Sequence, residues 1–164
     1  MKHYERIIFL DVDGVLNNCT SMYLATKGIH PPVKQSIFTM DVGCVRLFKV
    51  LLDEANAKFV ISSSWRKDTV AQSTRVFKAL AWCGFTDAKK YCVGVTPRQS
   101  CGRGGEIDHF IKANNVTNFV ILDDDVFDIH QKDQLVRTDH EVGLTVKNML
   151  AALKILELNY DYAV

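Results

Sequence analysis

The 164-residue chain has the composition of an ordinary globular protein, with 48% hydrophobic residues, 24% charged residues and a net charge of +1. These values exclude an intrinsically disordered chain, and the near-neutral charge gives by itself no sign of nucleic-acid binding. No apolar stretch approaches the roughly eighteen residues of a membrane span, and the N-terminus lacks a signal-peptide pattern. We expect one domain, residues 1–164, in a cytoplasmic protein that does not bind membranes.

The five cysteines are odd in number and scattered, and no two form a Cys-x-x-Cys pair. This pattern favours free thiols in a reducing compartment over a disulfide framework or a zinc site.

The charges are distributed unevenly along the chain. Residues 66–103 carry eight Lys or Arg against two Asp, whereas residues 104–164 carry five basic residues against eleven acidic ones. Solvated helix faces explain most of these lysines. An acidic, metal-binding side next to a basic segment would nevertheless suit a phosphorylated substrate.

Apolar runs alternate with amphipathic segments along the chain. The runs predict strands at 6–11, 58–62, 91–95 and 118–122 and an edge strand at 134–138. The amphipathic segments predict helices at 41–56, 69–82, 106–113 and 145–158, with loops at 17–39 and 102–105. This order indicates an α/β fold with a doubly wound, Rossmann-like, mostly parallel sheet, whose ligands bind at the carboxyl ends of the strands.

Two carboxylates at the end of the first predicted strand are the strongest functional signal. Four apolar residues at 7–10 lead directly into Asp11, Val12, Asp13 and Gly14. Since side chains alternate along a strand, Asp11 and Asp13 are expected on the same side. Their repulsion favours a cation, and Mg²⁺ binds carboxylates together with substrate phosphate oxygens. A surface turn is the alternative, but it does not explain the apolar residues before it.

Two other predicted strands also end in polar residues. The strand at 58–62 ends in Ser62, with Ser63 and Arg66 after it, and the strand at 118–122 is followed by Asp123 and Asp124. Because the carboxyl ends of parallel strands share one edge of the sheet, these side chains should meet the early aspartates. Acids, hydroxyls and a cation at one edge are the groups that phosphoryl transfer uses. For the serines, helix capping is the alternative.

The chemistry of each side chain indicates a role. Asp11 can attack phosphorus and form an acyl phosphate, and Asp13 can protonate the leaving alcohol and then deprotonate a water. Mg²⁺ held by Asp11, Asp123 and Asp124 would offset the repulsion between the nucleophile and the phosphate.

Phosphate binding requires donors and a positive charge. The Ser62 hydroxyl and the Ser63 amide are candidate donors to phosphate oxygens. Arg103, within Gly-Arg-Gly-Gly just before a predicted helix, is the first candidate for the neutralising cation, and Arg66 is the second. An ordinary surface arginine is the alternative for Arg103.

Together and in this order, the motifs resemble those of the haloacid dehalogenase (HAD) superfamily of Mg²⁺-dependent phosphatases. Asp-Val-Asp-Gly-Val at 11–15 is similar to the first motif, Ser62 to the second, and Asp-Asp at 123–124 to the fourth. The resemblance implies that Asp11 is the nucleophile, that Asp13 is the acid/base, and that the backbone carbonyl of Asp13 is a further metal ligand.

The third motif of that superfamily is usually a lysine ahead of the fourth. Here only Lys112 lies between Gly102 and Asp123, within a predicted helix. Arg103 is therefore expected to take the place of the lysine, with Arg66 and Lys112 as alternatives.

Several longer motifs resemble the HAD domains of RNA-repair proteins. They are Ser-Ser-Ser-Trp-Arg, Arg-Gly-Gly-Glu-Ile, Leu-Asp-Asp-Asp and Gly-Leu-Thr. The chain is also similar in size to the 3′-phosphatase domains of polynucleotide kinase-phosphatases. The resemblance implies an open site with a minimal cap or none, in which residues 17–40 form at most a flap.

The leading hypothesis is a Mg²⁺-dependent phosphomonoesterase that acts through an aspartyl phosphate, with nucleic-acid 3′-phosphate ends as candidate substrates. A nucleotide or small-molecule phosphatase is the alternative. A phospho-acceptor signalling domain has no use for Asp13, and a non-catalytic protein has no use for the pair Asp11 and Asp13. A two-metal nuclease fits the strand-end serine less well. No base-reading motif is apparent, so the sequence supports recognition of a phosphate end only.

Overall fold

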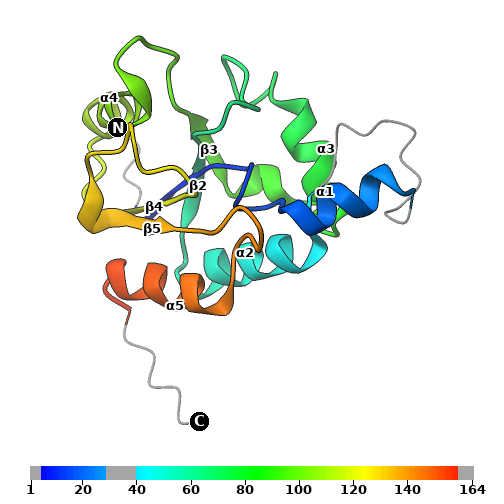
Figure 1. The fold of residues 1–164 in the computed structure, drawn as a ribbon. Coiled ribbons are helices and arrows are strands. Elements are labelled where there is room, and N and C mark those ends of the chain that lie inside the picture. Colours follow the sequence, from blue (N-terminus) through cyan, green and yellow to red (C-terminus); the bar gives the residue numbers. More distant parts are fainter. Residues whose placement is uncertain (1–4, 29–39, 159–164) are drawn as a thin grey trace.

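The computed structural model describes residues 5–28 and 40–158, which are built around a five-stranded sheet (Figure 1). The strands are β1 (Ile7–Leu10), β2 (Lys58–Ile61), β3 (Cys92–Val95), β4 (Phe119–Asp123) and β5 (Leu135–Arg137). Their order is β3-β2-β1-β4-β5, and every neighbouring pair is parallel. The predicted Rossmann-like sheet is confirmed, with β1 at its centre.

Helices cover both faces of this sheet. They are α1 (Cys19–Thr26), α2 (Val42–Glu54), α3 (Thr74–Trp82), α4 (Gly102–Asn114) and α5 (Val146–Ile155), with short 3₁₀ turns η1 (Ala88–Lys90) and η2 (Lys132–Gln134). Figure 1 shows α2 and α5 side by side below the sheet and α4 on the opposite side. None of the described helices combines the length and the hydropathy needed to cross a bilayer.

The alternating side chains of β1 supply two hydrophobic cores. Ile8 and Leu10 belong to the larger core, which also contains buried residues of α2, α3 and α5. Ile7 and Phe9 belong to the smaller core under α4, where Phe9 makes an edge-to-face contact with Phe110 at 5.7 Å between ring centroids. A strand that is buried on both faces reads as a continuous apolar run, which explains why β1 was predictable.

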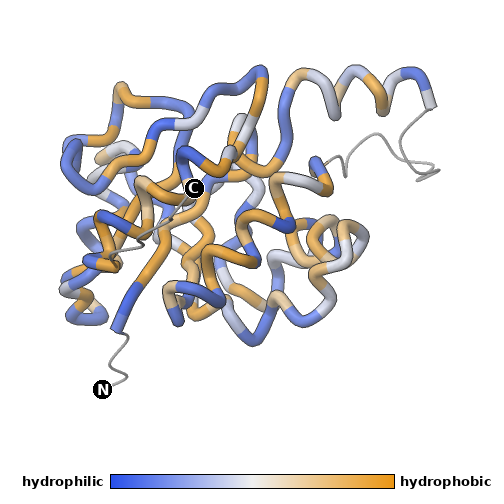
Figure 2. Tube along the Cα trace, turned by 90° about the horizontal axis from the view of Figure 1, so that it is seen from below, coloured by the Kyte–Doolittle hydropathy of each residue, from blue (hydrophilic) through white to orange (hydrophobic). Residues whose placement is uncertain are grey.

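The predicted loop at 17–39 was wrong for residues 19–26, which form α1. Asn18 caps this helix: its side chain accepts a hydrogen bond from the Ser21 amide at 2.7 Å. Met22 and Tyr23 are exposed, and Figure 2 shows hydrophilic and hydrophobic residues mixed along α1 at the margin of the molecule. Because α1 packs so little, it lacks the apolar period that identifies a helix in a sequence. Residues 29–39 lie outside the described part of the chain.

Two other helices begin four or five residues away from their predicted starts. Helix α3 begins at Thr74 rather than at residue 69, because Ser73 donates hydrogen bonds to the carbonyl of Thr69 and closes a separate turn. Helix α4 begins at Gly102, although residues 102–105 were predicted to form a flexible turn. Gly104 donates to the carbonyl of Asp128 at 2.8 Å, and a Cβ on Gly104 would lie 2.7 Å from that oxygen. Tertiary packing thus overrides the low helix propensity of glycine.

We expect Phe48→Ala in α2 to lower the free energy of unfolding by about 3 to 5 kcal/mol, because it leaves a cavity in the larger core. Phe48 is fully buried and contacts Phe59 edge to face. Val50→Ala on the exposed side of the same helix is the matched control and should change stability by less than about 0.5 kcal/mol. Urea denaturation of both variants would measure the difference; equal losses would contradict this packing.

Candidate active site

The register of the central strands brings three predicted site residues to one edge of the sheet. The Asp11 amide donates to the carbonyl of Leu122 at 3.0 Å, and the Ser62 amide donates to the carbonyl of Leu10 at 2.8 Å. These bonds extend the β1–β4 and β1–β2 ladders by one residue beyond the strands. Asp11 therefore lies between Ser62 and Asp123, as expected for carboxyl ends that share an edge.

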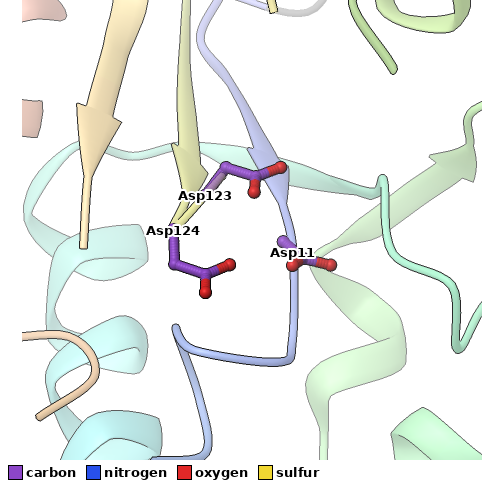
Figure 3. A group of neighbouring side chains, drawn as sticks. All are labelled: Asp11, Asp123 and Asp124. Atoms are coloured by element: carbon purple, nitrogen blue, oxygen red, sulfur yellow. The ribbon is translucent and has the colours of Figure 1, made fainter. Parts of the chain in front are cut away.

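Three carboxylates gather at this edge. One oxygen from each of Asp11, Asp123 and Asp124 lies within 4.8 Å of the other two, and Figure 3 shows the three side chains directed toward a common space. Among the described residues this is the one group of three or more potential metal ligands that is close enough to hold an ion. The loop after β1 packs tightly here, because a Cβ on Gly14 would lie 2.4 Å from Asp124 Oδ2.

Arg103 lies between two of these carboxylates. Its Nη1 is 2.7 Å from Asp123 Oδ2 and 3.1 Å from Asp11 Oδ1. Burial opposes the positive charge of Arg103, but the two aspartates outweigh it and raise the pKa of the guanidinium. The structure therefore places the first candidate for the third-motif cation in contact with both the first and the fourth motif.

Even with Arg103 present, this edge is short of positive charge. Burial raises the pKa of Asp11, and the Arg103 charge and a hydrogen bond from Ser63 only partly oppose that shift. Burial, followed by repulsion from Asp11, raises the pKa of Asp123 to about 7. A divalent cation that prefers oxygen ligands would relieve both effects, so the carboxylates fit Mg²⁺. The predicted ligation by the backbone carbonyl of Asp13 stays a prediction.

Ser62 carries an unused hydrogen-bonding group beside the carboxylates. Its hydroxyl is buried and has no hydrogen-bond partner in the described part of the chain. Buried hydroxyls usually form a hydrogen bond, so an unpaired hydroxyl at a strand end is suited to bind an oxygen atom of a ligand. Ser63 follows it, fully buried, and its hydroxyl accepts a hydrogen bond from the Trp65 amide at 3.3 Å.

Asp13 is oriented by two residues that were missed in the sequence. Trp65 Nε1 lies 3.0 and 2.9 Å from the two carboxylate oxygens of Asp13, and Asn17 Nδ2 donates to Asp13 Oδ1 at 2.8 Å. Trp65 is buried, and a buried indole N–H usually requires an acceptor. A tryptophan beside the predicted site therefore indicated a hydrogen bond from its N–H, but the sequence does not identify Asp13 as the acceptor.

Neighbouring hydrogen bonds fix the turn that carries Asp13. Asn17 Oδ1 accepts from the Gly14 amide at 2.9 Å, and Thr138 Oγ1 donates to the Gly14 carbonyl at 2.8 Å. Gly14 has a φ of +73°, which an L side chain adopts only with strain. Asn17 thus holds both the turn and the carboxylate that the turn presents.

Arg66, the second candidate for binding phosphate, is used within the protein. Its Nη2 forms a buried ion pair with Glu106 Oε2 at 2.5 Å, while Nε and Nη1 donate to the carbonyls of Thr96 and Ser63. All three guanidinium nitrogens therefore have protein acceptors. Arg66 positions the β2 end relative to α4, so the prediction that it binds the phosphate is not supported by its contacts.

Lys112 lies far from the carboxylates. It is exposed in the last turn of α4, nine residues after Arg103, which corresponds to about 13 Å along the helix axis. Arg103 is thus the only one of the three predicted cations that contacts the aspartates.

We expect Glu106→Gln to lower the free energy of unfolding by about 3 to 5 kcal/mol, because it leaves the buried Arg66 without its counter-charge. The exposed pair of Lys49 and Asp53 on α2 provides the control, since Asp53→Asn should cost at most about 1 kcal/mol. Denaturant titration would measure both changes. A small loss for Glu106→Gln would show that the pair does not hold α4 against the sheet.

Comparison with known proteins gives the family. A family model for the HAD domain in Swiss Army Knife RNA repair proteins matches residues 7–149. The match begins with β1 and ends within α5, so it includes all five strands and the carboxylate cluster. No curated protein and no solved structure gives a significant match. The chain belongs to the family of HAD domains found in Swiss Army Knife RNA repair proteins.

Proposed function

We propose that this protein is a Mg²⁺-dependent phosphomonoesterase that acts through an aspartyl phosphate on Asp11 and takes nucleic-acid 3′-phosphate ends as substrates. Family membership supports the coarser statement, a phosphatase or related hydrolase of the HAD type in RNA repair. The contact of Arg103 with Asp11 and Asp123, within a cluster of three carboxylates, is the observation that supports the proposed chemistry. In this contact, the proposed nucleophile, a cation and the proposed metal ligands lie next to one another. The RNA-repair family supports nucleic-acid ends as the substrate.

In the first step, a carboxylate oxygen of Asp11 attacks phosphorus in line. A new O–P bond forms to Asp11 while the bond from phosphorus to the leaving alcohol breaks. Asp13, in its protonated form, gives its proton to the departing oxygen. Arg103 neutralises charge beside Asp11, and the Ser62 hydroxyl, which has no partner among the described residues, donates to a phosphate oxygen.

In the second step, water replaces Asp11 on phosphorus. Asp13, now ionised, accepts a proton from the attacking water, inorganic phosphate leaves, and the carboxylate of Asp11 is restored. Mg²⁺ held by Asp11, Asp123 and Asp124 would supply charge neutralisation for the phosphate in both steps. Trp65 and Asn17 hold Asp13 in place between them.

The test is Mg²⁺-dependent phosphate release from a panel of substrates. It contains a 3′-phosphorylated oligonucleotide, a 5′-phosphorylated one, mononucleotides and p-nitrophenyl phosphate. We expect release from the 3′ end to be the most efficient. Preference for mononucleotides would instead favour the alternative, a nucleotide or small-molecule phosphatase, and EDTA should abolish every activity.

We expect Asp11→Asn to lower kcat by more than roughly a thousandfold, because the amide cannot act as the nucleophile. Thermal unfolding should show that the variant keeps its fold. Trapping of ³²P from labelled substrate on the wild-type protein, and its absence from the variant, would support the aspartyl phosphate. Unchanged turnover in Asp11→Asn would remove Asp11 as the nucleophile.

We expect Trp65→Phe to lower kcat/KM for an alkyl phosphate roughly tenfold more than for p-nitrophenyl phosphate. The change removes the indole N–H that orients Asp13 but keeps an aromatic ring in the core, and only a poor leaving group depends strongly on an oriented acid. Trp82→Phe on α3 is the matched control, since Trp82 is half exposed. Equal losses on both substrates would mean that Trp65 is merely structural.

A further inference from the structure

A cleft lies next to the carboxylate cluster, on the side of β5 and α5. It has a volume of about 580 Å³ and is lined by the segment that follows β5 and by the first turn of α5. Its lining residues include Asp124, Arg137, His140, Val142, Lys147 and Asn148. Clefts that hold small ligands commonly have volumes of about 300 to 1,000 Å³.

The cleft borders the proposed reaction centre. Asp124 belongs both to the cleft lining and to the group of three carboxylates. Thr138, also part of the lining, donates a hydrogen bond to the carbonyl of Gly14, the residue after Asp13. A leaving group protonated by Asp13 would therefore lie beside this cleft.

Two cations are available along this lining. Arg137 Nε donates to the Asp124 carbonyl at 3.2 Å, and its two terminal nitrogens have no hydrogen-bond acceptor in the described part of the chain. Lys147 is exposed and makes neither a hydrogen bond nor an ion pair with a described residue. Of the acids in the lining, Asp124 belongs to the carboxylate cluster, and Asp139 Oδ1 accepts the Glu141 amide at 2.9 Å.

Lys147 occupies an unfavourable position for helix stability. It is the second residue of α5, and the positive end of a helix dipole disfavours a cation there. Thr145 and Asn148 already cap this end by a reciprocal pair of hydrogen bonds. Neither the helix dipole nor the cap therefore explains a lysine at this position.

We propose that this cleft binds the leaving-group side of the substrate, and that Arg137 and Lys147 contact its next phosphate, the first internucleotide phosphate before the 3′ end. This inference rests on the proposed function. A lone phosphomonoester has no second phosphate to place there, whereas a nucleic-acid strand does. Among the described lining residues, only Val142 has a large apolar side chain, and His140 is the one aromatic ring. Since Phe, Tyr and Trp are lacking there, recognition should depend mainly on the strand's backbone.

The experiment compares three substrates: a 3′-phosphorylated dinucleotide, a nucleoside 3′-phosphate and p-nitrophenyl phosphate. We expect the wild type to favour the dinucleotide over the nucleoside 3′-phosphate, for all four terminal bases alike. Lys147→Ala should lower kcat/KM for the dinucleotide relative to that for p-nitrophenyl phosphate by roughly tenfold, mainly through KM. It should also reduce the salt dependence of dinucleotide binding by about one phosphate contact.

Lys154→Ala, at the other end of α5, is the matched control and should leave all ratios unchanged. Because alanine is favourable in the first turn, Lys147→Ala should not unfold the helix. An unchanged ratio in an active Lys147→Ala enzyme, or a preference set by the terminal base, would overturn the assignment of the cleft. Failure of the proposed function is distinct, because it would appear as no Mg²⁺-dependent turnover of p-nitrophenyl phosphate by the wild type.

Discussion

The ion pairs of Arg103 with Asp11 and Asp123 are the contact on which the rest of the site depends. Without this cation, two buried carboxylates would lie side by side at a strand edge with no ion-pair partner among the described residues. With it, three carboxylates still share one cation, and burial together with repulsion from Asp11 raises the pKa of Asp123 to about 7. The proposed site thus contains one fixed cation, Arg103, and enough remaining negative charge to bind a metal cation as well.

The position of Arg103 is itself a product of close packing around α4. Gly104 allows the segment at 128–131 to approach the first turn of the helix, and the buried pair of Arg66 with Glu106 ties the same helix to the end of β2. A buried ion pair adds little net stability, but it is costly to break and so specifies one arrangement. Arg66 therefore helps to position Arg103, because it fixes α4, the helix that carries Arg103.

Two features beside the carboxylates have different proposed tasks. Trp65 and Asn17 orient Asp13, which is proposed to move protons to and from the substrate oxygen. The cleft borders the turn that carries Asp13, through the hydrogen bond from Thr138 to Gly14, and it offers Arg137 and Lys147 to a second phosphate. Such an arrangement fits an enzyme that recognises where a strand ends.

The sequence by itself determined the parallel sheet, its main helices and the carboxylate edge, because buried strands appear as apolar runs and their ends carry the polar residues. It also ranked Arg103 as the first candidate for the cation, but it left Arg66 and Lys112 open as alternatives. Only the tertiary structure decided among them, showed that α4 begins at Gly102, and paired Trp65 with Asp13. These features depend on contacts between segments far apart in the chain, where local propensity and periodicity carry no information.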